Sequence, residues 1–159
     1  MHADRRSAAL PFVAVGVTCV VAGGLVAAAT ASIPSQLASW TTAYLVLVAG
    51  VSQVALGAGQ ALLTPRTPSR RLIAVEFAAW NGGNAAVVAG TLLGLVPMVD
   101  AGGVLLVVAL ALLARGTRGD SRRGSGNRGR WPLYAFRALV VILLVSVPIG
   151  LVLGRITPS

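Results

Sequence analysis

The sequence predicts an all-α polytopic membrane protein, a bundle of five transmembrane helices. Of its 159 residues, 56% are hydrophobic and only 11% are charged, whereas a soluble domain has roughly a quarter charged residues. The mean hydropathy is +0.84. The apolar residues form long stretches. The lengths of these stretches are close to that of a helix that crosses the hydrocarbon core, which needs about 20 residues. We therefore expect residues 1–159 to form a single membrane domain.

Local residues mark where the five spans begin and end. Gly94 can end the third span, and Pro97 suits the first turn of the fourth, where its missing N–H has no partner to lose. Trp40 and Tyr44 are typical of an aromatic belt at a membrane interface, and Pro148 is expected to kink the fifth span. The predicted spans are residues 9–31, 41–63, 72–94, 97–114 and 132–154.

The first stretch has a second interpretation. A basic head with Arg5 and Arg6, an apolar run and the tripeptide Ala29-Thr30-Ala31 together are typical of a secretory signal with its cleavage site. The run is longer than the roughly 7–15 residues of a signal core, which favours an uncleaved first span. Cleavage would leave the orientation of the other spans unchanged.

Loops with arginine alternate with loops without it, and this pattern predicts the orientation of the chain in the membrane. Arginines precede the first span and follow the second and fourth, whereas the loops after the first and third spans have none, and only Arg155 follows the fifth. By the positive-inside rule the N-terminus is cytoplasmic and the C-terminus outside. All 13 basic residues are arginine, and this composition, rich also in Ala, Gly and Val, is typical of a GC-rich bacterial genome. We therefore expect a multi-pass protein of the bacterial plasma (inner) membrane.

The loop of residues 115–130 is rich in Arg and Gly, has no hydrophobic residue, and is expected to be flexible and cytoplasmic. Its arginines are candidates for contact with anionic lipid headgroups, at about 1 kcal/mol per residue near the surface, or with an acidic partner. A role in topology alone is the simpler alternative. Because the arginines other than Arg137 lie outside the apolar spans, where they serve to orient the chain in the membrane, no nucleic acid is expected as a partner. The candidate contact residues are Arg118, Arg122, Arg123, Arg128 and Arg130.

The composition argues against most catalytic and metal sites. Cys19 is the only cysteine and His2 the only histidine, and there are four acidic residues. A disulfide, a cysteine-rich or histidine-based metal centre and a Ser-His-Asp triad all need more than this within one chain. We expect no enzyme activity, no metal and no cofactor.

Seven side chains within the predicted spans are candidate site residues, because polar or charged groups there are costly and usually face protein or water. At about 1.5 Å per residue they fall into two layers, one near the cytoplasmic interface and one near the midplane. The first layer is Glu76, Gln60 and Arg137, and the second is Gln53, Trp80, Asn81 and Asn84.

Three interpretations of Glu76 and Arg137 remain open. The two can form a gate or proton-coupled pair, they can neutralise each other and fix how span five packs on span three, or both can reach the headgroups separately. For Gln53, Asn81 and Asn84, interhelical hydrogen bonds are the simplest role, at about 0.6 kcal/mol each.

Small residues in the second and third spans predict close helix packing. Gly50 and Gly57 share one face, and Gly83 and Gly90 share another. Gly90 and Gly94 also form a GxxxG motif, which lets membrane helices approach closely. We expect spans two and three to pack together through these faces.

Two classes of function are favoured. The first is a non-catalytic small subunit, assembly factor or scaffold of a larger cell-envelope membrane complex, with other membrane proteins or further copies as partners. The second is a small homo-oligomeric transporter or channel that uses Glu76, with a polar path through Gln53 and Asn84. An enzyme acting on lipid ranks last, because Glu76 would lack an evident partner nucleophile.

Overall fold

The computed structural model describes residues 2–33, 35–63, 69–116, 134, 136–143 and 145. Within these residues the regular structure is helical throughout, which confirms the all-α prediction. Four helices are long and apolar enough to cross a membrane: Ala9–Thr30, Gln36–Ala61, Arg70–Leu93 and Val96–Arg115. They correspond to the first four predicted spans.

The predicted fifth span falls only partly within the described residues. Tyr134, residues 136–143 and Val145 are helical, and Phe136, Val140 and Leu143 are buried on one side of this segment. Pro148 lies outside the described residues, and the five-span count stays a prediction.

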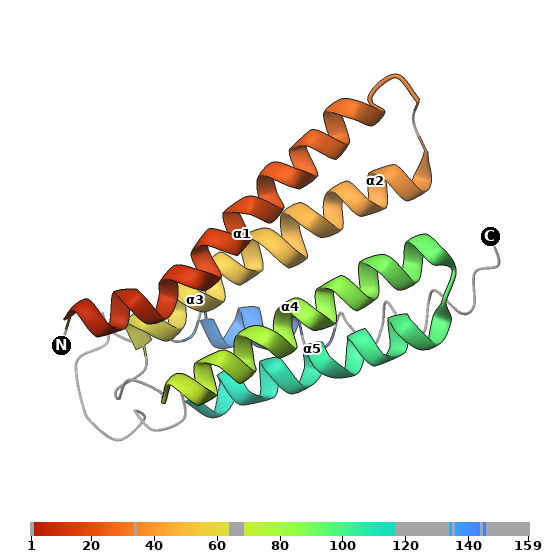
Figure 1. Ribbon diagram of the computed structural model, residues 1–159. Coiled ribbons are helices and arrows are strands. Elements are labelled where there is room, and N and C mark those ends of the chain that lie inside the picture. The colour runs from red at the N-terminus through yellow and green to blue at the C-terminus, as the bar shows by residue number, and fades with distance from the viewer. Residues whose placement is uncertain are drawn as a thin grey trace. The chain divides into compact units, whose positions relative to one another are not determined.

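The chain divides into two compact units, Met1–Leu62 and Leu63–Ser159. In the first, α1 (His2–Thr30) runs beside a long helix made of α2 (Gln36–Ala43), η1 (Tyr44–Val51) and α3 (Ser52–Leu63), forming the first hairpin (Figure 1). In the second, α4 (Arg70–Leu93) packs along α5 (Val96–Gly116), forming the second hairpin. That residues 1–159 form a single domain stays a prediction.

The second span begins earlier than predicted, and a serine cap accounts for its position. The second span begins at Gln36, five residues before the predicted Thr41, because the Ser35 side chain accepts a hydrogen bond from the N–H of Ala38. Such a cap satisfies one of the amide groups that a helix start leaves without a partner. Ser69 caps α4 in the same way, through the N–H of Leu72 at 3.2 Å.

A tight turn joins the helices of the second hairpin. Gly94 ends α4 with φ of +67°, a left-handed conformation that favours glycine. The N–H of Leu95 donates to the carbonyl of Gly90, and the N–H of Gly94 to that of Thr91. This is the Schellman pattern, and Pro97 follows as the second residue of α5. Both predicted boundary residues act as expected.

Glycines bring the two helices of the first hairpin into backbone contact. A Cβ atom on Gly16 would lie 2.7 Å from Val54 and 2.9 Å from the carbonyl oxygen of Gly50. One on Gly57 would lie 2.6 Å from Cβ of Phe12. Real Cβ atoms essentially never approach so closely. The packing of α1 on the long helix made of α2, η1 and α3 therefore requires glycine at these positions.

A similar row of close glycine contacts joins the two helices of the second hairpin. We call such a row a seam. A Cβ on Gly83 would lie 2.9 Å from the carbonyl oxygen of Gly102, and one on Gly102 would lie 2.7 Å from that of Gly83. Gly90 lies equally close to the backbone of Val99. The close contacts of these glycines are therefore made within each hairpin, and the packing of spans two and three on each other stays a prediction. Gly94 of the GxxxG motif ends the helix, and within the described residues a Cβ there would meet no atom within 4 Å; a role of this motif in packing against another helix stays a prediction.

The middle of the second span is a π-helix, which the sequence did not predict. Across η1 the hydrogen bonds span five residues, and at its end both the N–H and the hydroxyl of Ser52 donate to the carbonyl of Leu47. A turn closed by such bonds holds more residues than an α-helical turn. The π-helix therefore changes which side of the helix the residues of α3 occupy.

Two adjacent glycines of α4 provide a matched test of the second seam. We expect Gly83→Ala to destabilise the folded protein by about 1–3 kcal/mol, because the new methyl group forces α4 and α5 apart. Gly82→Ala should be neutral or slightly stabilising, since a Cβ there meets no atom within 4 Å. Thermal unfolding in mild detergent measures both, and equal effects would contradict the seam.

Single-residue deletions test the π-helix. Deleting Leu47, whose side chain is 60% exposed, should convert the wide turn into an α-helical one and leave the faces on either side in register. Deleting Ala55, in the α-helical part, should rotate Gly57 away from Phe12 by about 100°. We expect near-normal expression and melting temperature for the first variant and a large loss for the second. The opposite order would rule out the π-helix.

Candidate functional site

One face of α4 buries polar side chains. Glu76, Trp80 and Asn84 step by four residues and so lie on one side of the helix, with exposed fractions of 0%, 1% and 5%. Gly83 and Gly90, which contact α5, lie on the same side. The face therefore combines close helix packing with three polar groups.

The hydrogen bonds of this face are incomplete. The amide nitrogen Nδ2 of Asn84 donates to the carbonyl of Trp80 at 2.9 Å. Within the described residues, the other amide atom, Oδ1, and the indole Nε1 of Trp80 are buried without a hydrogen bond. A buried polar group without a partner costs about 1–3 kcal/mol. Packing alone does not explain these residues.

A second polar face lies on α3, in the first hairpin. Gln53 and Gln60 are seven residues apart and share one side of the helix, with exposed fractions of 0% and 8%. Both amide atoms of Gln53 are buried without a hydrogen bond among the described residues. Thr41 and Ser52, also buried, donate instead to backbone carbonyls of their own helix. Gln53 is thus the least satisfied side chain of this hairpin.

The remaining predicted site residues have other settings. Asn81 is half-buried, and its Nδ2 donates to the carbonyl of Phe77 at 2.9 Å. Arg137 lies half-buried in the segment 136–143, and its pairing with Glu76 stays a prediction. The candidate headgroup contacts Arg118, Arg122, Arg123, Arg128 and Arg130 lie outside the described residues.

Hydrogen bonding is the chemistry that these faces offer. The indole of Trp80 is a donor, the amides of Gln53 and Asn84 present acceptors, and Glu76 adds a carboxyl group. In the described segments, no three His, Cys, Asp or Glu side chains gather as a metal site would require. The faces can bind water, a polar solute or a polar side chain of another membrane helix.

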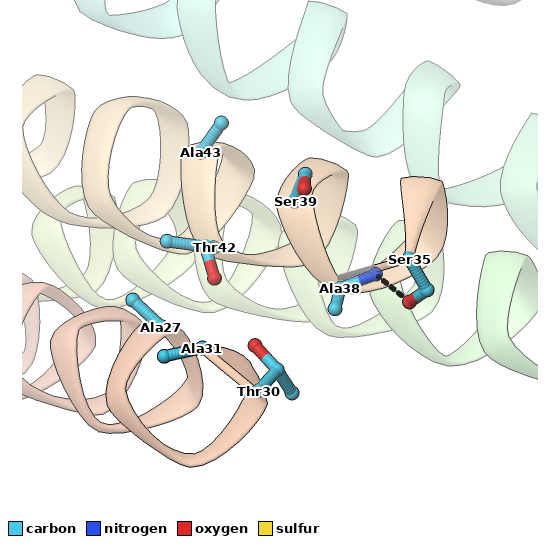
Figure 2. Close-up of a pocket in the computed structure, with 8 residues that line it drawn as sticks. All are labelled: Ala27, Thr30, Ala31, Ser35, Ala38, Ser39, Thr42 and Ala43. Carbon is cyan, nitrogen blue, oxygen red and sulfur yellow. Dashed lines mark hydrogen bonds between the residues drawn. The ribbon is translucent and has the colours of Figure 1, made fainter. Parts of the chain in front are cut away.

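A groove between α1 and α2, which sequence reasoning missed, has a volume of about 380 Å³. Figure 2 shows small side chains from both helices lining it. The only sequence signal is a run of alanines and hydroxyl residues in place of large apolar ones. The lining residues are Ala27, Thr30, Ala31, Ser35, Ala38, Ser39, Thr42 and Ala43.

Comparisons with protein-family models, with curated proteins and with solved structures find no match to this chain.

Replacing Gln53 tests whether its amide serves folding. We expect Gln53→Leu to raise the free energy of unfolding by about 1–3 kcal/mol, because leucine fills the space without burying unsatisfied polar atoms. Asn81→Leu should instead lose about 0.5–1.5 kcal/mol with its hydrogen bond to Phe77. Unfolding in mild detergent measures both free energies. A Gln53→Leu variant less stable than the wild type would show that the amide has a partner in the folded protein.

Proposed function

We propose that this chain is a non-catalytic small subunit, assembly factor or scaffold of a larger cell-envelope membrane complex. The observation that supports the proposal is a contrast among its glycines. Gly24 and Gly82 lie within α1 and α4, are exposed, and would meet no atom within 4 Å among the described residues if they carried a Cβ. The glycines of the two seams have backbone or side-chain atoms within 3 Å of that position.

The surroundings of Gly82 support a membrane helix as the partner. Ala74, Ala78 and Gly82 step by four residues along α4 and are all exposed, which gives a stripe of small residues on its outer side. In a membrane such stripes let a second helix approach closely. Glycine within a helix costs about 1 kcal/mol relative to alanine, and no contact within the described chain compensates for it at Gly82. A transmembrane helix of another subunit is the partner that would use it.

The positions of charged residues support a cytoplasmic N-terminus and a plasma-membrane location. Arg70 and Arg71 begin α4 and Arg115 ends α5, so all three lie at the end of the second hairpin opposite its turn. In the first hairpin, Arg5 and Arg6 belong to the start of α1, and the described residues of its turn are uncharged. Basic residues on one side of the membrane mark the cytoplasmic face. With the fifth span, the C-terminus lies outside.

A small homo-oligomeric transporter or channel is the second candidate. It is favoured by the buried carboxyl of Glu76 and by the unsatisfied polar atoms of Gln53 and Asn84. Polar groups inside a membrane commonly mark a solute or ion path. In this case Glu76 is the coupling or gating charge, and the two amides line the path.

Native mass spectrometry of the complex extracted from its own membrane tests the first candidate. We expect a stoichiometric foreign polypeptide with the wild type, and its loss with Gly82→Leu, because the leucine side chain blocks close approach. Val108→Leu is the control. Val108 lies on α5 and is 44% exposed, and this variant should retain the polypeptide.

A homo-oligomer carrying only lipid would contradict the subunit proposal. Flux through proteoliposomes would then decide the second candidate, which predicts that Glu76→Gln abolishes transport at unchanged expression. Absence of both a foreign polypeptide and a Glu76-dependent flux would overturn both.

A further inference from the structure

The groove between α1 and α2 lies at the end of the first hairpin that carries the turn. Its lining runs from Ala27 to Ala31 at the end of α1, and from Ser35 to Ala43 on the facing helix. Its volume of about 380 Å³ is at the lower end of the about 300–1,000 Å³ that is typical of small-molecule sites. It therefore fits a small group.

Thr42, which lines this groove, differs from the other described threonines in its hydrogen bonding. Four of the five threonines in the described residues donate to the carbonyl oxygen four residues earlier in their helix. Thr42 is the exception, and Figure 2 shows its oxygen directed toward α1 across the groove. Within the described residues the Ser39 hydroxyl also makes no hydrogen bond, and the Ser35 hydroxyl accepts one but keeps its own proton to donate.

The lining determines what these donors can bind. No lining side chain is charged, so the groove offers nothing to a phosphate beyond neutral hydroxyl groups. Alanines make up half of the lining and suit an apolar or weakly polar group. The stacked rings of Trp40 and Tyr44, 5.1 Å apart, lie on the same helix, and such aromatic residues mark the level of the membrane interface. At this level the ester carbonyls of lipids are uncharged hydrogen-bond acceptors.

We propose that the groove binds the glycerol-ester region of one membrane lipid, with Thr42 and Ser39 donating to an ester carbonyl oxygen. The acyl chain leaves along the apolar surface of the hairpin, and the headgroup stays in the interface. The site is independent of the partner helix proposed for α4, because it lies in the other unit and uses other residues.

Lipid binding to the full-length protein tests this site. The delipidated protein in mild detergent is titrated with diacyl phosphatidylglycerol or with its ether-linked analogue, which lacks the carbonyl oxygens, and bound lipid is counted by native mass spectrometry. We expect the wild type to bind one ester lipid about three- to tenfold more tightly than the ether lipid, the value of one hydrogen bond.

Two pairs of variants make the test specific. Thr42→Val, which preserves shape, should reduce the preference for ester lipid, and Thr18→Val should leave it unchanged, because the Thr18 hydroxyl already donates to the carbonyl of Ala14 at 2.9 Å. Ala38→Leu should fill the groove and abolish the site, whereas Ala28→Leu, at an exposed position outside the lining, should not.

Equal affinity of the wild type for ester and ether lipids would overturn the proposal. So would a preference that survives in the double variant Ser39→Ala, Thr42→Val, since both donors are then gone. Binding of lipid that Ala38→Leu leaves unchanged would place the lipid elsewhere on the protein.

Discussion

Helices in a lipid bilayer gain little by burying apolar side chains against one another, because the acyl chains around them are equally apolar. Their association depends on van der Waals contact at short range and on hydrogen bonds. In this protein the short-range contact is between backbones. Gly83 and Gly102 approach within 3 Å of the positions where each other's side chains would begin, and Gly16 and Gly50 are placed similarly in the first hairpin. Any larger residue at these sites would separate the helices and weaken every contact along the hairpin.

This mode of packing accounts for the unusual surfaces of the chain. Some large apolar side chains, such as Leu110, are buried, but many others are exposed to the surroundings, among them Leu25, Leu93 and Val104. The small residues that remain outside the seams then need another explanation. At Gly82 we infer a partner helix, and between α1 and α2 a lipid ester group. Both proposals use space that the hairpins leave open.

The helices were predictable from the sequence because their signals are local. Length and hydropathy indicate each span, and Gly94 and Pro97 carry the conformational preferences of a turn in their own backbones. The partners of the glycines were not predictable in this way. Gly50 and Gly83 have the same spacing whichever helix they face, so the sequence does not distinguish packing within a hairpin from packing between spans two and three.

Two further features depend on contacts that a sequence pattern does not contain. The π-helix of residues Tyr44–Val51 consists of ordinary apolar residues and glycine, and Ser52 shows its role only through the shared bond to Leu47. The burial of Gln53 and Glu76 was expected from their position in apolar spans. That Gln53 lacks hydrogen bonds while Thr41 and Ser52 have them follows only from atomic positions.

The most direct test of backbone contact as the basis of the fold is a double-mutant cycle on Gly83 and Gly102, measured by unfolding in mild detergent. Because each glycine faces the carbonyl of the other, one alanine already pushes α4 and α5 apart and leaves room for the second. We predict that the double variant Gly83→Ala, Gly102→Ala loses clearly less stability than the sum of the two single variants. Losses that add within about 0.5 kcal/mol, as for independent sites, would contradict the seam and the account built on it.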